Sequence, residues 1–225
     1  MKIEYLDEVD STNSYIRRYL DVGEDVIVCA RRQTGGRGTK GRSFCSEEGG
    51  VYLSALTFYR DLPVSRAFRI MTHSAVSVCR TAKAFGAEVQ IKWPNDVFAA
   101  GRKLSGTLIE NVFAGDKVRC SIVGIGLNVN NDVSALGGIA VALSELVGRV
   151  KTEEVRDELI ANLMRRDDFS DYLSFVRFLG KEITVIEGEK SYPAVAREVS
   201  EDGRLIVDAG GQTHALSAAE ISVRF

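Results

Sequence analysis

The most informative stretch of the sequence is the ten-residue segment Gln33-Thr34-Gly35-Gly36-Arg37-Gly38-Thr39-Lys40-Gly41-Arg42. It holds four glycines and three basic residues. Glycines let backbone N–H groups approach a ligand closely, and arginines offer two-pronged hydrogen bonds to phosphate or carboxylate. Because the apolar run 26–30 precedes it, we expect a buried strand to anchor one end of this loop. The stretch predicts an anion-binding loop, although its composition fits a solvated surface loop equally well.

The spacing of these residues excludes two common nucleotide-binding motifs. The P-loop pattern G-x-x-x-x-G-K-[ST] is absent, and so is the spacing of a dinucleotide-binding fingerprint. A nucleic-acid patch is a further alternative, but few aromatic residues interleave the cations and the net charge of the chain is −2. We therefore expect no nucleic-acid partner.

A second group of polar residues is Lys92-Trp93-Pro94-Asn95-Asp96. Pro94 fixes its own φ and favours an extended Trp93, so this bend can direct Lys92 and Asp96 into one cavity. Asp96 is a candidate ligand for Mg²⁺, which usually takes one or two carboxylates together with substrate phosphates. A solvated aspartate in an ordinary turn is the alternative.

Two glycine-containing apolar runs follow, at 103–110 and 124–130. Gly106 inside the first run suggests that another group approaches the backbone closely. Lys103 is a candidate site cation, and an ordinary lysine at a strand edge is the alternative. Asn128 lies inside the second run, and a buried asparagine needs hydrogen-bond partners. A purine edge and the protein backbone are equally good partners for it.

The length and composition of the chain set its class. With 225 residues, 45% hydrophobic and 27% charged, it has the composition of a globular protein with a substantial core. The four cysteines show no C-x-x-C or metal-ligand spacing, so we expect reduced thiols. The N-terminus lacks a signal-peptide pattern, and no apolar run approaches the roughly 20 residues of a membrane span. We therefore expect a cytoplasmic protein without a membrane partner.

The chain divides into a mixed part and an all-β tail. Residues 181–225 show short apolar runs separated by turns, which predicts a small β-barrel. We place the boundary near Leu179-Gly180, giving units 1–179 and 180–225. Before it, the patterns predict strands at 3–6, 26–30, 51–59, 89–92, 97–99, 103–112 and 118–124, and helices within 10–20, 63–86 and 152–178.

Taken together and in this order, the motifs resemble those of the biotin protein ligases. The S-T-N segment of that family matches Ser11-Thr12-Asn13, and its Q-T-x-G-R-G-R-x-G-R segment matches residues 33–42 with one exception. K-W-P-N-D is intact at 92–96. K-[LI]-x-G-[IL]-L-[IV]-E corresponds to 103–110, with Thr107 at the variable aliphatic position, and G-x-G-x-N to 124–128. The resemblance covers the chain from end to end.

The resemblance implies an α/β (α+β) fold, in which a mixed sheet flanked by helices, like a class II aminoacyl-tRNA synthetase core, precedes an SH3-like barrel. It implies a ligase that uses ATP, Mg²⁺ and biotin. Biotin and ATP form biotinyl-5′-AMP, and a lysine of a biotin carboxyl carrier protein, such as the acetyl-CoA carboxylase subunit, then takes the biotin. Because Ser11 follows the start closely, we expect no N-terminal DNA-binding domain. The protein is expected to be a monomer or a homodimer.

The resemblance also implies roles for individual residues. Lys103, Arg37, Asp96 and Lys92 correspond to catalytic positions, with Asp96 contacting Mg²⁺ or the acceptor lysine. Biotin contacts fall on Ser11, Thr12, Asn13, Gln33, Gly36, Arg37, Gly38, Thr39, Lys103 and Gly106. ATP contacts fall on Arg37, Arg42, Phe44, Lys92, Trp93, Asn95, Lys103 and Asn128.

Two positions depart from the pattern of the family. Thr39 stands where an arginine is usual, which bears on retention of the adenylate. Phe44 stands where tryptophan is common, and it should preserve packing or adenine stacking. Two other functions remain as alternatives. One is a lipoate or octanoate transferase of the same fold, and the other is a non-catalytic biotin-binding sensor.

Overall fold

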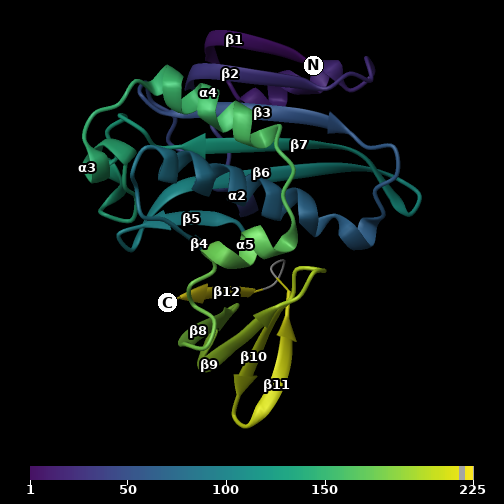
Figure 1. The fold of residues 1–225 in the computed structure, drawn as a ribbon, viewed down its shortest axis with the longest axis vertical. Helices are drawn as coiled ribbons and strands as arrows, with labels where there is room; N and C mark the ends of the chain where they lie inside the picture. Colours follow the sequence, from purple (N-terminus) through teal and green to yellow (C-terminus); the bar gives the residue numbers. More distant parts are fainter. Residues whose placement is uncertain (218–220, 225) are drawn as a thin grey trace.

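The computed structural model describes residues 1–217 and 221–224, except for the side chains of residue 40 and residues 221–224. Figure 1 shows two parts, a large sheet covered by helices and a smaller sheet near the C-terminus. The cysteines are all free, as the sequence predicts. In the described ranges, no helix is both long and apolar enough to cross a membrane.

The large sheet has seven strands in the order β1-β2-β3-β7-β6-β5-β4. The pair β1–β2 is parallel and the other neighbours are antiparallel, which confirms the predicted mixed sheet. Strands predicted from apolar runs are all present, although several are longer than expected. Their bounds are β1 Lys2–Val9, β2 Val26–Gln33, β3 Val51–Phe58, β4 Gln90–Lys92, β5 Asp96–Ala99, β6 Arg102–Ala114 and β7 Lys117–Leu127.

Helices cover both faces of this sheet because its central strands are apolar on both sides. On β2, Val26 and Val28 pack with Ile16 of α1 (Thr12–Ile16), whereas Ile27 and Cys29 face the opposite core. This alternation is the two-residue period of a strand. The opposite face carries α2 (Phe68–Ala84), α4 (Thr152–Leu163) and α5 (Phe169–Phe175), which lie in front of the sheet in Figure 1.

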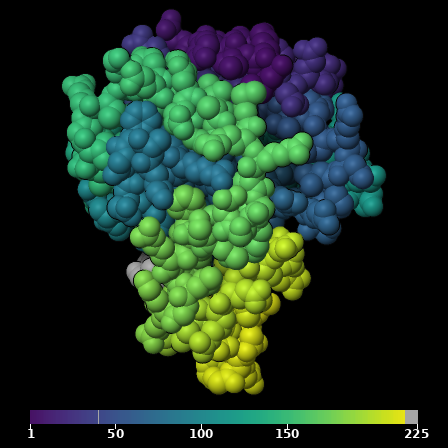
Figure 2. Space-filling view, in the orientation of Figure 1, coloured from purple at the N-terminus to yellow at the C-terminus, as the bar shows by residue number. Residues whose placement is uncertain are grey.

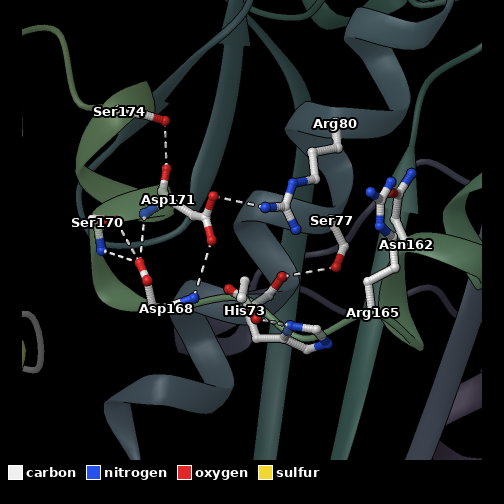
Figure 3. A network of polar contacts seen from close by, with 10 residues as sticks. His73, Ser77, Arg80, Asn162, Arg165, Asp168, Ser170, Asp171 and Ser174 are labelled. Atoms are coloured by element: carbon white, nitrogen blue, oxygen red, sulfur yellow. Dashed lines mark hydrogen bonds and ion pairs between the residues drawn. The ribbon is translucent and has the colours of Figure 1, made fainter.

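The two longer predicted helices differ from the structure in where they begin or in their continuity. The helix expected from Pro63 begins instead at Phe68, after a 3-10 turn, η3 (Val64–Arg66). The helix expected over 152–178 is interrupted between α4 and α5. Asp168 causes the restart, because its carboxylate accepts hydrogen bonds from the backbone N–H groups of Ser170 and Asp171 (Figure 3).

Short elements complete the large part. The helix expected over 10–20 is the single turn of α1 followed by the 3-10 turn η1 (Arg17–Tyr19). The other short elements are η2 (Thr39–Gly41), η4 (Ser134–Leu136) and α3 (Leu143–Val147), and the sequence patterns did not predict them.

The C-terminal part is all β, as predicted. Its antiparallel sheet has five strands in the order β11-β10-β9-β8-β12. Figure 2 shows it as a narrower lobe that joins the large part. Its hydrophobic core is continuous with the large core, so the boundary at 179–180 remains a prediction. The strands are β8 Glu182–Glu187, β9 Lys190–Val199, β10 Leu205–Ala209, β11 Gln212–Leu216 and β12 Ile221–Arg224.

Candidate functional site

A pocket lies on the α1 face of the large sheet, where glycines interrupt two neighbouring strands. Gly106 of β6 pairs with Gly126 of β7, and Gly124 lies two positions earlier on β7. The missing side chains leave space above the sheet. The pocket brings together the predicted residues Ser11, Thr12, Asn13, Gln33, Arg37, Gly38, Thr39, Phe44, Asp96, Lys103 and Gly106.

One end of the pocket is a hydrogen-bonded set of uncharged side chains. The Oε1 atom of Gln33 accepts hydrogen bonds from the backbone N and the Oγ1 of Thr12, at 2.9 and 3.1 Å. Ser54 donates to Thr12 Oγ1 at 2.8 Å, and its Oγ also contacts Asn13 Oδ1. Gln33 Nε2 donates to Ser46 Oγ at 2.8 Å. Mutual bonds hold these side chains in fixed orientations, so the donors and acceptors are arranged before a ligand arrives.

Asn13 is held against the sheet by an acidic side chain. Its Nδ2 donates to Glu110 Oε2 at 3.0 Å, and Glu110 also forms a 2.7 Å ion pair with Arg17. A Cβ atom on Gly124 would collide with the amide of Asn13. The absence of a side chain at Gly124 therefore leaves the space that the Asn13 amide occupies.

Phe44 covers the glycines of the pocket. A Cβ atom on Gly126 would collide with the Phe44 ring, and one on Gly106 would come within 3.3 Å of it and 3.0 Å of Lys103 Cε. The close approach predicted at Gly106 is confirmed. Phe44 is itself packed edge-on against Tyr52, with ring centroids 6.4 Å apart. These contacts explain why β6 and β7 carry glycine here.

The other end of the pocket is charged. Lys103 Nζ lies 2.8 Å from Asp96 Oδ1, and about a third of each side chain is exposed. Lys103 follows the first residue of β6 and Asp96 begins β5, and their strands pair with an irregular register between Val97 and Phe98. The bend at 92–96 thus delivers one of its two candidate groups, Asp96, to the pocket.

The Gly-Arg loop folds over the pocket through its own backbone bonds. Gly38 N donates to the Arg42 carbonyl at 2.6 Å, and Phe44 N donates to the Gly36 carbonyl at 2.9 Å. Arg37 is exposed and donates to Ser14 Oγ at 2.9 Å. Arg42 is exposed and lies outside the pocket lining. The loop therefore presents one guanidinium, Arg37, at the pocket itself.

The remaining predicted residues lie outside the pocket lining. Lys92 lies over the Phe98 ring, with Nζ 5.1 Å from its centroid. Trp93 is buried, and the Nδ2 of Asn95 donates to the Thr107 carbonyl at 3.1 Å. Asn128 is buried, and its Oδ1 accepts a hydrogen bond of 3.1 Å from the side chain of Asn131, which is neither a purine edge nor the backbone. Gly36 is buried within the loop, where a Cβ atom would collide with the Phe44 carbonyl.

Sequence reasoning missed three polar residues that organise the pocket. Ser54 and Ser46 are buried and complete the bonds of Thr12 and Gln33, and Glu110 holds Asn13. One feature of the sequence could have identified Ser54, because this polar residue lies among the apolar residues of β3. A buried hydroxyl in such a run needs a partner, and here the partners are site residues.

Comparison with known proteins finds a matching family model for the large part and another for the C-terminal part. The model of the biotin/lipoate A/B protein ligase family matches residues 5–128, and that of the biotin protein ligase C-terminal domain matches residues 178–224. The bifunctional ligase/repressor BirA of Bacillus subtilis is 40% identical over 131 residues, which cover 56% of this chain and 40% of that protein. The chain thus matches less than half the length of this relative.

Two relatives match over nearly the whole chain. The biotin–[acetyl-CoA-carboxylase] ligase of Mycobacterium tuberculosis is 27% identical over 98% of this chain and 88% of its own. A biotin protein ligase from Aquifex aeolicus, solved in complex with biotin and ATP, superposes with a TM-score of 0.77. It is 26% identical, over 99% of this chain and 98% of that one. Since the first family model spans more than half of the 225 residues, the chain belongs to the biotin/lipoate A/B protein ligase family.

Proposed function

We propose that this protein is an ATP-dependent biotin protein ligase. The observation that carries the proposal is a pocket that is uncharged and hydrogen-bonded at one end and charged at the other. The polar set around Thr12 and Gln33 suits the ring of biotin, and Lys103 suits its carboxylate. The names of the full-length relatives and the match to the biotin ligase C-terminal domain support biotin as the substrate.

In the first step, the biotin carboxylate attacks the α-phosphorus of ATP, and pyrophosphate leaves as biotinyl-5′-AMP forms. Nucleophile and triphosphate are both anionic, so cations must neutralise the point of attack. Lys103 faces the pocket and Arg37 lies on the loop above it, and we assign both to this role. Arg42, Phe44 and Asn128 remain candidates for the ATP side.

Magnesium enters this reaction with ATP, as part of the substrate. Among the residues that the structure describes, no group of three or more His, Cys, Asp or Glu side chains could hold a metal ion. The pocket offers the carboxylate of Asp96. One carboxylate fits a Mg²⁺ ion whose other ligands are phosphates and water.

In the second step, the ε-amine of a carrier lysine attacks the acyl carbon, and AMP leaves. Asp96 is suited to accept a hydrogen bond from that amine, because its carboxylate is partly exposed beside Lys103. We propose a biotin carboxyl carrier protein as the partner, and acetyl-CoA carboxylase as the enzyme that it serves. The name of the Mycobacterium relative supports this partner.

The test is to incubate the protein with a biotin carboxyl carrier domain, MgATP and biotin, lipoate or octanoate, and to weigh the carrier. We expect one biotinyl group on the wild-type carrier and none on a carrier whose acceptor lysine is replaced by arginine. A lipoyl or octanoyl adduct instead of a biotinyl one would identify the alternative transferase. Binding of biotin with neither an adduct nor pyrophosphate release would identify a sensor.

A further inference from the structure

The Trp93–Asp96 bend is in direct contact with the C-terminal sheet. Trp93 Nε1 donates a hydrogen bond of 3.1 Å to the carbonyl of Gly203, across 110 positions of the sequence. Gly203 lies in the turn between β9 and β10, and both it and Trp93 are buried. A buried indole N–H needs an acceptor, so this bond ties the two parts of the molecule at a defined point.

The same bend is bonded from two further elements. Tyr172 of α5 donates its hydroxyl to the Pro94 carbonyl at 2.8 Å, and Tyr172 is fully buried. Asn95 donates to the carbonyl of Thr107 on β6 at 3.1 Å. The next residue is Asp96, whose carboxylate pairs with Lys103. Three elements therefore hold the backbone that carries Asp96, and one of them belongs to the C-terminal sheet.

Gly203 fits this junction because it has no side chain. Its φ is +91°, and a Cβ atom there would lie 2.5 Å from Cδ2 of Phe68. The Phe68 ring is itself packed edge-on against Tyr172 and Phe169, at centroid distances of 5.9 and 6.5 Å, so it has little room to yield. The turn is closed by the Gly203 N–H, which donates to the Ser200 carbonyl at 2.9 Å.

We propose that the turn Ser200–Arg204 is a positioning element for adenylation, which holds the Trp93–Asp96 bend and thereby the Asp96–Lys103 pair. The inference rests on the proposed ligase function. The polar end of the pocket is built from Thr12, Gln33 and Ser54, which donate and accept their hydrogen bonds within the large part. Disturbing the turn should therefore reduce the rate of adenylation and leave biotin affinity nearly unchanged.

The test compares Gly203→Ala with the control Gly210→Ala. Gly210 also lies in a turn of the C-terminal sheet at positive φ, +56°, but nothing lies within 4 Å of its Cβ position. Both alanines therefore carry a backbone cost, and only the first clashes with the large part. Biotin affinity is measured by calorimetry, and kcat and KM for ATP by biotin-dependent ATP–pyrophosphate exchange.

We expect Gly203→Ala to lower kcat for exchange by about tenfold or more, since small displacements of catalytic groups have effects of this size. Its biotin Kd should stay within about twofold, or about 0.4 kcal/mol, because Thr12, Gln33 and Ser54 bond to one another within the large part and not to the C-terminal turn. Gly210→Ala should behave as wild type in both. The inference would be overturned if kcat for exchange fell equally in Gly203→Ala and Gly210→Ala. It would also be overturned if Gly203→Ala weakened biotin binding by the same factor as it lowered kcat.

A second readout does not depend on activity. The sequence contains one tryptophan, so fluorescence excited selectively at tryptophan reports on Trp93 alone. We expect a shifted emission maximum in Gly203→Ala and an unchanged one in Gly210→Ala. A wild-type protein without exchange activity would refute the proposed function, whereas unchanged emission in Gly203→Ala would refute the junction inference separately.

Trp93→Phe gives an independent route if Gly203→Ala does not fold. This variant removes the N–H donor and keeps an aromatic ring in the junction. As for Gly203→Ala, we expect a lower kcat for exchange and an unchanged biotin Kd. Exchange at the wild-type rate would show that the bond to Gly203 does not position the bend.

Discussion

At the scale of single residues, the proposed chemistry depends most on Lys103. Its ammonium group is 2.8 Å from Asp96 in a pocket whose other end is uncharged and hydrogen-bonded. A lysine on the neighbouring strand offers a matched control, because Lys117 forms an ion pair of the same 2.8 Å length with Asp61 and does not line the pocket. Comparing the two lysines separates the effect of the site from the effect of losing an ion pair.

We predict that Lys103→Ala lowers pyrophosphate release by about a hundredfold or more, because removal of one preorganised donor from a transition state has effects of that order. Lys117→Ala should retain wild-type activity. Biotin-dependent pyrophosphate release measures both, and thermal unfolding checks that both variants fold. Normal release by Lys103→Ala would remove this residue from the mechanism.

Thr39 is the second residue with a specific expectation. It lines the pocket and is exposed, and the resemblance to the motifs of the biotin protein ligases implies an arginine at this position. An arginine would add several charged donors, and a charged hydrogen bond contributes about 1.5–3 kcal/mol. We predict that Thr39→Arg slows the escape of biotinyl-AMP by about tenfold or more. Trapping the released adenylate with hydroxylamine measures the escape.

Thr34→Arg is the control for this substitution, because Thr34 is exposed in the same loop but does not line the pocket. It should leave the escape rate unchanged. If Thr39→Arg and Thr34→Arg release adenylate as fast as wild type, residue 39 has no part in retention.

At the scale of elements, a polar network fastens α2 to the segment that joins α4 and α5. Figure 3 shows His73, Ser77 and Arg80 of α2 near residues 162–174. Arg80 pairs with Asp171 at 2.7 Å. The His73 ring contacts Asp167 through Nδ1 and the Leu163 carbonyl through Nε2 at 2.9 Å. With oxygen acceptors at both nitrogens, the imidazolium form satisfies this geometry best.

This network predicts a pH dependence of stability. Burial alone lowers the pKa of His73, but the hydrogen bond and charge of Asp167 and the bond to Leu163 outweigh it, so the pKa is raised above 6.5. The stabilisation is therefore complete below about pH 6.5 and is lost as the pH rises through the folded-state pKa. Arg80 faces the same region and opposes protonation.

We expect the unfolding free energy of wild type to fall, as the pH rises above about 6.5, by more than that of His73→Gln. Urea denaturation at each pH measures the difference. The control is His214→Gln, since the other histidine is exposed on β11, and it should keep the wild-type dependence. If the unfolding free energies of wild type and His73→Gln depended on pH in the same way, His73 would not be the group responsible.

At the scale of the whole molecule, the two sheets share one hydrophobic core. The same cluster of buried side chains contains Leu53 of the large sheet and Ile183 and Val207 of the C-terminal sheet. The Trp93–Gly203 bond crosses the same boundary. A shared core predicts that the two parts unfold together.

We predict a single cooperative unfolding transition in urea, with the same midpoint by far-UV circular dichroism and by Trp93 fluorescence. Circular dichroism reports on both parts, whereas Trp93 reports on their junction. Two separate midpoints would show that the C-terminal sheet unfolds independently of the large part. The boundary near residue 180 would then separate two units of different stability.

Local patterns in the sequence were sufficient for the strands and for the all-β tail. Apolar runs such as those of β2, β3 and β7 and the turns of the tail depend on neighbouring residues alone. Helix ends were harder, because the cap at Asp168 competes with an otherwise helical pattern. The arrangement of the large sheet and the roles of site residues came from the resemblance of whole motifs to a family, since no local pattern specifies which strands pair.

Tertiary structure alone decided which side chains meet. Ser54 reaches Thr12 across 42 positions, and Trp93 reaches Gly203 across 110. The glycine at 126 is explained by the ring of Phe44, which comes from a distant loop. The sequence determined where strands and turns form, because backbone propensities act over a few residues. The partners of a side chain depend on strand order and on register, in which a shift of one residue turns every side chain to the opposite face of the sheet.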